Sequence, residues 1–125
     1  MQSLRWITLL TLIIVSSAFL TGCPSGTDTP PEVREYARSA QPEHTNLAET
    51  YNRSCRSCHS RGMGGAPLTG DGESWQTLLE QRGMDTLIRH TVEGFRGMPP
   101  MGGCPDCDRS DFRDLIDFMM QPHDY

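Results

Sequence analysis

The sequence predicts a small all-α domain of about four helices that wraps around a group other than polypeptide. Three observations lead to this prediction. Apolar residues recur at helical spacing, no β-hairpin signature or internal repeat is present, and long glycine-rich loops join the expected helices. About 80 residues are few for a purely hydrophobic core, and long irregular loops in so small a domain need something to surround. We therefore expect a cofactor or a covalent cross-link to stabilise the domain.

Four helices are expected within residues 44–125, the segment predicted to be the domain. Their ranges are 44–55, 73–82, 86–93 and a final helix that begins after residue 108. Asp85 is the expected N-cap of the third helix, and Asp108 or Ser110 that of the fourth. The apolar positions are Leu47 and Tyr51; Trp75, Leu78 and Leu79; Leu87, Ile88 and Val92; and Phe112, Leu115, Ile116 and Met119.

The N-terminus carries the features of an export signal. Residues 6–20 form an uncharged apolar run of 15 residues after Arg5, which is short for a bilayer span and typical of a secretory signal. The run ends in Leu-Thr-Gly-Cys, which resembles the lipobox of bacterial lipoproteins, where the chain is cleaved before the cysteine and the thiol is diacylated. We therefore expect residues 1–22 to be a signal peptide and Cys23 to be lipidated. An ordinary cleaved signal or an uncleaved anchor is the alternative.

This signal predicts an exported protein, lipid-anchored to the cell membrane or outer membrane, whose domain faces the periplasm or the cell exterior. Residues 23–43, with Cys23 first, are rich in proline, small polar and charged residues, and we expect a flexible tether there, with a short helix over 32–40 as an option. Removing the signal leaves a net charge of −6, from 10 Arg and no Lys against 16 Asp and Glu. So acidic a chain argues against nucleic-acid binding.

The stretch CRSCH, from Cys55 to His59, carries the expected chemistry. C-x-x-C-H is the signature of covalent c-type haem attachment. Residues three apart on a helix share one face, so the thiols of Cys55 and Cys58 can reach the two vinyl groups of one macrocycle. His59 then follows at a position where its imidazole can bind the iron. The predicted cofactor is one covalently attached haem c.

Two other uses of these thiols are compatible with their spacing. A redox-active dithiol normally follows a strand in a βαβ unit, which the pattern here does not contain. A zinc site would combine Cys55 and Cys58 with Cys104 and Cys107. Export disfavours the zinc site, because unprotected thiols tend to be oxidised outside the cytoplasm. We therefore favour haem over both alternatives.

The remaining cysteines fit the same interpretation. With Cys23 assigned to lipid and Cys55 and Cys58 to thioethers, Cys104 and Cys107 remain as a pair close enough in sequence to form a disulfide. We expect this disulfide to fix the loop that leads into the last helix, although a redox role is an alternative.

Residues 51–119 resemble a class I cytochrome c, and most specifically the cytochrome c5 group. The matching pieces are YNRSCRSCHS, GAP, Trp75, GMDTLI and, above all, MPPMGGCPDC before an amphipathic terminal helix. The resemblance implies that the first and last helices pack together around one haem, with Tyr51 and Phe118 as candidates for the crossing contact. The chain departs from the family at Met101, where a basic residue is usual, and in lacking lysine.

The resemblance also implies the surroundings of the iron. The carbonyl of Pro67 should accept a hydrogen bond from His59, which would fix the tautomer of the ring. The second axial ligand should be Met98, which lies directly before two prolines that stiffen the loop. Met101 and His90 are the alternatives. Trp75 is expected at the haem either as a donor to a propionate or as a packing residue.

Two protein ligands leave the iron without an open coordination site, and one-electron exchange is the chemistry that remains. A thioether ligand favours ferrous iron and raises the potential. We expect a membrane-tethered electron carrier rather than an enzyme, acting in a respiratory or related chain with redox partner proteins and no small-molecule substrate. The alternatives are a five-coordinate haem sensor or peroxidase, and a haem relay subunit of a larger oxidoreductase complex.

Overall fold

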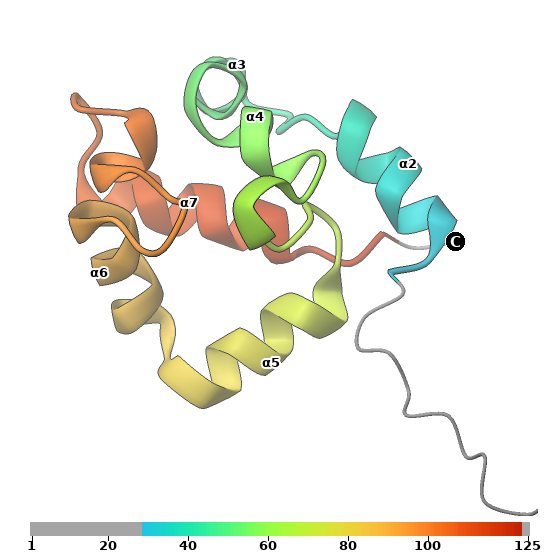
Figure 1. The fold of residues 1–125 in the computed structure, drawn as a ribbon. Coiled ribbons are helices and arrows are strands. Elements are labelled where there is room, and N and C mark those ends of the chain that lie inside the picture. The colour runs from blue at the N-terminus through green and yellow to red at the C-terminus, as the bar shows by residue number, and fades with distance from the viewer. Residues whose placement is uncertain (1–28, 124–125) are drawn as a thin grey trace, which may run out of the picture.

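The computed structural model describes residues 29–123, and the regular structure in this range is helical (Figure 1). A single antiparallel bridge between Phe95 and Met98 is the only β-type pairing within these residues. The longer helices are α2 (Pro31–Ser39), α3 (Thr45–Thr50), α4 (Arg56–His59), α5 (Gly72–Arg82), α6 (Met84–Glu93) and α7 (Arg109–Met120). The predicted all-α class is confirmed.

One nearly continuous helical segment leads into the haem motif. Helix α3 passes directly into a π-helical turn, Tyr51–Cys55, and then into α4, which ends at His59. In the π turn the backbone N–H of Arg56 bonds to the carbonyl of Tyr51, five residues earlier instead of four. The helix predicted over 44–55 is therefore present and extends through the whole CRSCH stretch.

Helices α5 and α6 are joined by a single residue, Gly83, whose φ of 75° belongs to the left-handed region that glycine adopts without penalty. Asp71 caps α5 by accepting a hydrogen bond from the backbone N–H of Ser74 at 3.2 Å. The prediction of Asp85 as the N-cap of the third helix is wrong. Gly83 occupies the cap position, and Asp85 lies inside the first turn, where its charge still suits the helix dipole.

Helix α7 begins as its sequence predicts. The Asp108 carboxylate accepts from the backbone N–H groups of Ser110 and Asp111, and the Asp111 carboxylate accepts from the N–H of Asp108 at 2.8 Å, which completes a capping box. Its apolar face is buried, with Phe112, Leu115, Ile116 and Met119 all within the core.

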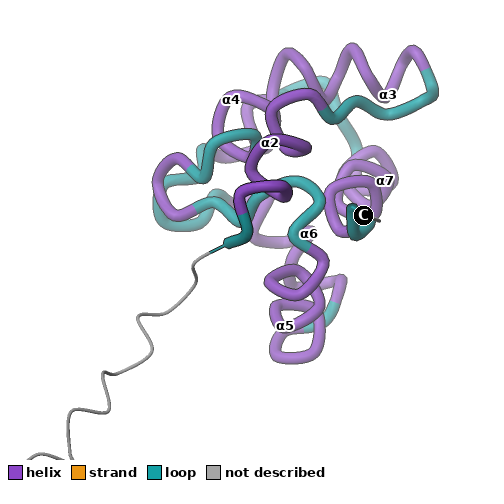
Figure 2. Tube along the Cα trace, turned by 90° about the vertical axis from the view of Figure 1, so that its right-hand side faces the viewer, coloured by secondary structure: helices purple, strands orange, loops and turns teal. Residues whose placement is uncertain are grey.

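The first and last helical segments pack against each other as expected. The ring of Tyr51 meets that of Phe118 edge to face, with centroids 5.0 Å apart and planes at 77°. The phenol oxygen of Tyr51 also shares a hydrogen bond of 2.9 Å with the hydroxyl of Thr69, and both residues are 0% exposed. In both views α3 and α5 lie at opposite ends of the molecule, and α7 runs between them (Figures 1 and 2).

The flexible tether expected over 23–43 is wrong for its second half. Helix α2 packs on the domain through a face of small residues at i, i+4 and i+7, Val33, Ala37 and Ala40, which are 0–5% exposed. These residues are too small and too few to give a strong hydrophobic signal, but they allow close packing. The folded unit therefore begins before residue 44, and the short helix considered over 32–40 is confirmed.

Specific contacts hold α2 in place. Tyr36 stacks on His123 with ring centroids 4.3 Å apart, and it covers Gly70, where an added Cβ would lie 2.4 Å from the Tyr36 ring. The guanidinium of Arg56 donates to the carbonyl of Arg38 at 2.7 Å, joining α2 to the haem motif.

Among residues 29–123, none of the helices combines the length and apolarity that a bilayer span requires. The predicted signal peptide and Cys23 lie outside the described residues.

Candidate haem-binding site

An apolar cleft of about 1020 Å³, part of it open to solvent, lies between α4, α5, α6, α7 and the loop that carries Met98. Its lining is mostly hydrocarbon, as ligand sites require. All six residues predicted to bind the cofactor line this cleft: Cys55, Cys58, His59, Pro67, Trp75 and Met98.

The two thiols of the haem motif are available for covalent attachment. Cys55 is 8% exposed and Cys58 is half-buried, and both sulfurs are free. Burial raises the pKa of the Cys55 thiol, an effect that the hydrogen bond with Ser54 partly opposes.

His59 is fixed by hydrogen bonds at its ring and at its backbone. The ring is 6% exposed, and its Nδ1–H donates to the carbonyl of Pro67 at 2.8 Å, which is the contact that the resemblance implies. Its own carbonyl accepts from the backbone N–H of Thr69 at 2.9 Å. Burial lowers the pKa of His59, although the Pro67 bond acts in the opposite direction, so the ring is neutral near pH 7. With Nδ1 protonated, Nε2 carries the lone pair that an iron ion requires.

Trp75 serves the site by packing. Its indole N–H donates to the carbonyl of Leu68 at 2.8 Å, and its ring stacks near His59 with centroids 5.6 Å apart. The possibility that this N–H donates to a haem propionate is not supported, because the indole has a single hydrogen and Leu68 already accepts it. Trp75 remains a cofactor-lining residue through its ring, which is 4% exposed.

A tight two-residue turn presents Met98. The backbone N–H of Phe95 donates to the carbonyl of Met98 at 3.1 Å, and that of Met98 donates to the carbonyl of Phe95 at 2.9 Å. Gly94, with φ of 85°, ends α6 directly before the turn, and an added Cβ there would lie 3.0 Å from the nitrogen of Pro100. Met98 lines the cleft, whereas Met101 packs against the hydrophobic core instead.

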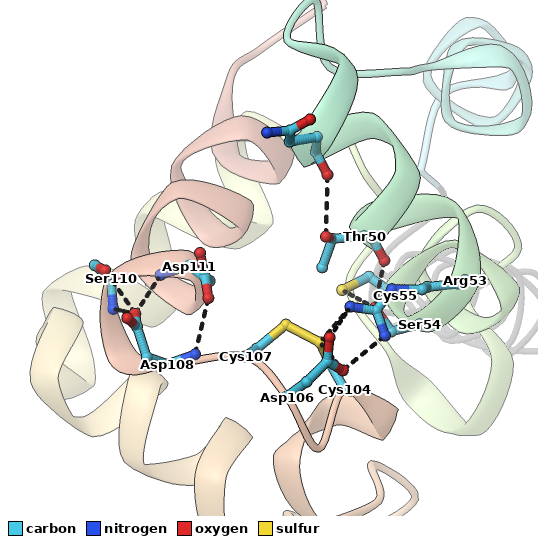
Figure 3. The surroundings of a disulfide bond; sticks show 11 residues. Thr50, Arg53, Ser54, Cys55, Cys104, Asp106, Cys107, Asp108, Ser110 and Asp111 are labelled. Carbon is cyan, nitrogen blue, oxygen red and sulfur yellow. Dashed lines mark hydrogen bonds and ion pairs between the residues drawn. A yellow bond between two sulfur atoms is a disulfide. The ribbon is translucent and has the colours of Figure 1, made fainter.

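The disulfide lies beside the haem motif. Cys104 and Cys107 are bonded to each other, with Cα atoms 5.4 Å apart, and both are buried (Figure 3). Arg53 reaches across from the π turn and donates to both carboxylate oxygens of Asp106, at 2.9 and 2.8 Å, and to the sulfur of Cys104 at 3.2 Å (Figure 3). This bidentate contact ties the loop after Met98 to the segment that carries Cys55.

The same arrangement contradicts the zinc alternative. The sulfurs of Cys104 and Cys107 are used by each other, and residues 29–123 contain no group of three or more His, Cys, Asp or Glu side chains placed to hold a metal ion. A redox dithiol at Cys55 and Cys58 also lacks its usual setting, because the described part of the chain forms helices and not a βαβ unit.

Sequence reasoning missed a cluster at one end of the cleft. The guanidinium carbons of Arg82 and Arg96 lie 5.1 and 5.2 Å from the ring centroid of Phe95, and the ring of His90 stacks on Phe95 at 4.0 Å. All four residues line the cleft. They come from α5, α6 and the loop after α6, so no single motif joins them. The only local sequence feature that points to this cluster is Phe-Arg-Gly at residues 95–97, directly before Met98.

The cleft fits a haem c. It offers two free thiols three residues apart, a neutral imidazole with Nε2 unprotonated, a thioether, and walls of hydrocarbon. This donor set combines soft sulfur and imidazole ligands, which suit haem iron.

Several known proteins are similar to this chain in sequence. A family model described as cytochrome c oxidase, cbb3-type, subunit III, matches residues 42–119. Cytochrome c5 from Ectopseudomonas mendocina is 36% identical over 66 residues, which cover 52% of this chain and 76% of that protein. Cytochrome c-555 from Prosthecochloris aestuarii is 35% identical over 83 residues, 60% of this chain and 83% of that protein.

The fold is also similar to that of a chain in a solved crystal structure. The structure is titled as an electron transfer complex of nitrite reductase with cytochrome c, and the match has a TM-score of 0.53 and 32% identity over 62% of this chain and 93% of that chain. The chain therefore belongs to the class I cytochromes c, and it is a haem c electron carrier, not an enzyme, whose Cys55 and Cys58 with His59 form the haem motif.

Proposed function

We propose that this protein is a membrane-tethered electron carrier of a respiratory or related chain, with His59 and Met98 as the two axial ligands of its haem iron. The observation that carries the ligand assignment is that His59 and Met98 line the same apolar cleft, whereas Met101 does not. Haem c, when bound, takes up and releases one electron at its iron.

The residues around the cleft support this role by limiting what the iron can do. The Pro67 carbonyl keeps Nδ1 of His59 protonated and leaves Nε2 for the metal. Trp75, Ile116 and Met119 are 2–4% exposed and keep water away from the interior of the site. With both axial positions filled by protein atoms, neither ligand has to change when the electron moves, and little reorganisation is needed.

The ligand assignment is tested by replacing the two methionines separately. We expect Met98→Ala to abolish the long-wavelength thioether–ferric charge-transfer band and to lower the midpoint potential by on the order of 0.1 V or more, within the span of about 0.8 V that axial ligands control. Met101→Ala should leave the band unchanged. The assignment is wrong if the band is lost in Met101→Ala and retained in Met98→Ala.

The same experiment addresses the five-coordinate sensor or peroxidase. A six-coordinate carrier should bind carbon monoxide slowly and incompletely when reduced at neutral pH, and Met98→Ala should bind it quickly and completely. Fast, complete binding by the unmodified protein would favour the open-site alternative.

The lipid tether is proposed from the sequence. Its greatest length follows from the number of residues between Cys23 and the start of the described structure. Thr29, where the described structure begins, is six positions after Cys23, so a lipidated Cys23 would lie within roughly 21 Å of it along an extended chain. Two or more acyl chains anchor a protein firmly. Replacing Cys23 with Ser should move the protein from the membrane fraction to the soluble fraction with its haem spectrum unchanged. Retention in the membrane fraction would reject the lipid anchor.

A relay subunit of a larger oxidoreductase complex is the second candidate. The matched family model is named for a subunit of an oxidase, and the solved neighbour is titled as part of an electron transfer complex. Purification from mild detergent distinguishes the two: a carrier should elute alone, and a relay subunit with its complex.

A further inference from the structure

A haem carries two propionate carboxylates, and this cleft must accommodate them. A carboxylate taken out of water is costly unless it is paired and hydrogen-bonded. Apart from the cysteines of the haem motif, the cleft-lining residues with hydrogen-bonding side chains are Ser54, His59, Trp75, Arg82, His90, Thr91 and Arg96.

Four of these side chains already donate to backbone carbonyls. Trp75 donates to Leu68 at 2.8 Å, Nδ1 of His59 to Pro67 at 2.8 Å, Thr91 to Leu87 at 3.1 Å, and Ser54 to Thr50. The donors that remain are Arg82, Arg96 and His90, and all three surround Phe95 at one end of the cleft.

The two arginines are positioned but not paired. None of the ion pairs found within residues 29–123 involves Arg82 or Arg96; those pairs are Arg38–Glu35, Arg53–Asp106 and Arg113–Asp85. Both guanidinium groups instead lie over the Phe95 ring, which limits their freedom while leaving their N–H donors available. In a chain with a net charge of −5, two unpaired arginines at one cleft indicate an anionic ligand there.

The backbone of Arg96 gives an independent reason. Arg96 has a φ of 54° in the two-residue turn before Met98, a region that disfavours residues with a Cβ. Glycine would be relaxed at this position. A strained backbone that carries a long charged side chain indicates that the side chain is needed at this point.

We propose that Arg82 and Arg96 bind the haem propionates. The propionate edge of the cofactor then lies at Phe95, and its thioether edge lies at Cys55 and Cys58. Planar guanidinium groups suit carboxylates because they can form two parallel hydrogen bonds. The assignment does not depend on Met98 as a ligand or on a lipid at Cys23.

The test compares Arg82→Gln, Arg96→Gln and Arg96→Gly in the haem-loaded protein, with Arg89→Gln as the matched control. Arg89 is exposed on α6 and does not line the cleft, so its substitution removes the same charge nearby without touching the site. We expect the three cleft variants to shift the propionate bending mode in the resonance Raman spectrum. Each should also lower the reduced-to-oxidised ratio at fixed potential about two- to tenfold, a tenfold change being 59 mV. Arg89→Gln should leave the Raman mode unchanged.

Arg96→Gly keeps the experiment decisive if a glutamine variant folds poorly, because glycine relaxes the turn while it removes the side chain. The proposal is overturned if the propionate mode stays the same in all cleft variants, or if Arg89→Gln shifts it equally. An acidic partner is the other source of carboxylates, and a polyglutamate peptide at low ionic strength provides that comparison. Binding of this peptide to the holoprotein that is lost in Arg82→Gln and Arg96→Gln would show that the arginines are free, and it would also overturn the proposal.

Discussion

The two segments that present His59 and Met98 to the cleft are held in different ways. His59 ends a helical segment, is 6% exposed, and is fixed at its ring by Pro67 and at its backbone by Thr69. Met98 is half-buried and ends a two-residue turn that is closed by two backbone hydrogen bonds to Phe95. The residues on either side of Met98 include Arg96 and Met101, the two non-glycine residues of the described chain with positive φ.

This contrast shows that the imidazole is oriented by tertiary contacts and the thioether by local backbone geometry. The contacts around His59 come from the loop over 67–69 and from α5, so several of them must fail before the ring turns. The Met98 turn depends on Gly94 and on prolines that restrict the chain. We therefore expect substitutions on the His59 side to act on stability and loading, and those on the Met98 side to act on spectra and potential.

The largest expected effect comes from removing the imidazole. His59→Ala should reduce the yield of haem-loaded protein at least fivefold, because it deletes the ligand next to the thioethers and leaves a cavity beside Trp75 that costs on the order of 2–5 kcal/mol. Met98→Ala should keep near-normal covalent haem. Haem stain on denaturing gels and the pyridine haemochrome spectrum measure both. Equal haem loading of the two variants would contradict the expectation that the His59 side controls loading and the Met98 side does not.

A smaller effect is expected from the hydrogen bond between Tyr51 and Thr69, which supports the segment that carries His59. Tyr51→Phe should lower the free energy of unfolding by about 1–2 kcal/mol, because it leaves the buried hydroxyl of Thr69 without its partner. Denaturant titration of the loaded protein measures this change. The double variant Tyr51→Phe with Thr69→Val should recover part of the loss, and additive losses would show that the hydrogen bond is not the cause.

On the Met98 side the corresponding test compares two substitutions of Arg96. Arg96→Gly and Arg96→Gln both remove the guanidinium, but only glycine relaxes a turn that otherwise holds a side chain at positive φ. Arg96→Gly should therefore have a free energy of unfolding about 1 kcal/mol higher than that of Arg96→Gln. The same denaturant titration measures the difference, and Arg89→Gln is the control for loss of charge. Equal stability of the two Arg96 variants would show that the positive φ stores no strain.

The smallest effect on stability is expected from the ion pair between Arg53 and Asp106, which joins the segment before His59 to the loop after Met98. Arg53 lowers the pKa of the Asp106 carboxyl, chiefly through the hydrogen bonds between them. A carboxyl with a lowered pKa in the folded state stabilises the protein above its ordinary pKa, and that contribution is lost as pH falls through the folded value. Asp106→Asn should therefore flatten the acid branch of stability against pH, while both proteins converge at low pH. Because both side chains of the pair are exposed to solvent, added salt should reduce the difference.

Much of the fold could be predicted from the sequence because the main helices carry their own signals. The apolar face of α7 and the Asp108 cap are local features, and the structure shows both. The third helix shows where local signals mislead: Asp85 is a good cap by type, but α6 begins at Met84, so Gly83, two residues before Asp85, takes the cap position. Helix α2 was missed as part of the domain because its buried face is made of Val and Ala, which resemble a linker in composition.

The residues of the site also divide into those that the local sequence indicates and those that only the fold brings together. Cys55, Cys58 and His59 are adjacent in the chain, so their spacing alone indicates haem, and Met98 is marked by the prolines that follow it. The hydrogen bond that removes the indole N–H of Trp75 from the cleft depends on where the Leu68 carbonyl comes to lie. The cluster of Arg82, Phe95 and Arg96 depends on the meeting of α5 with the loop after α6.

The sequence by itself determined the helical class, the haem motif and the pairing of the last two cysteines, because each rests on residues within a few positions of one another. Only the tertiary structure decided which polar groups remain available at the cleft and how α2 joins the domain. Burial and hydrogen-bond satisfaction depend on neighbours that are distant along the chain, so a local pattern does not contain them.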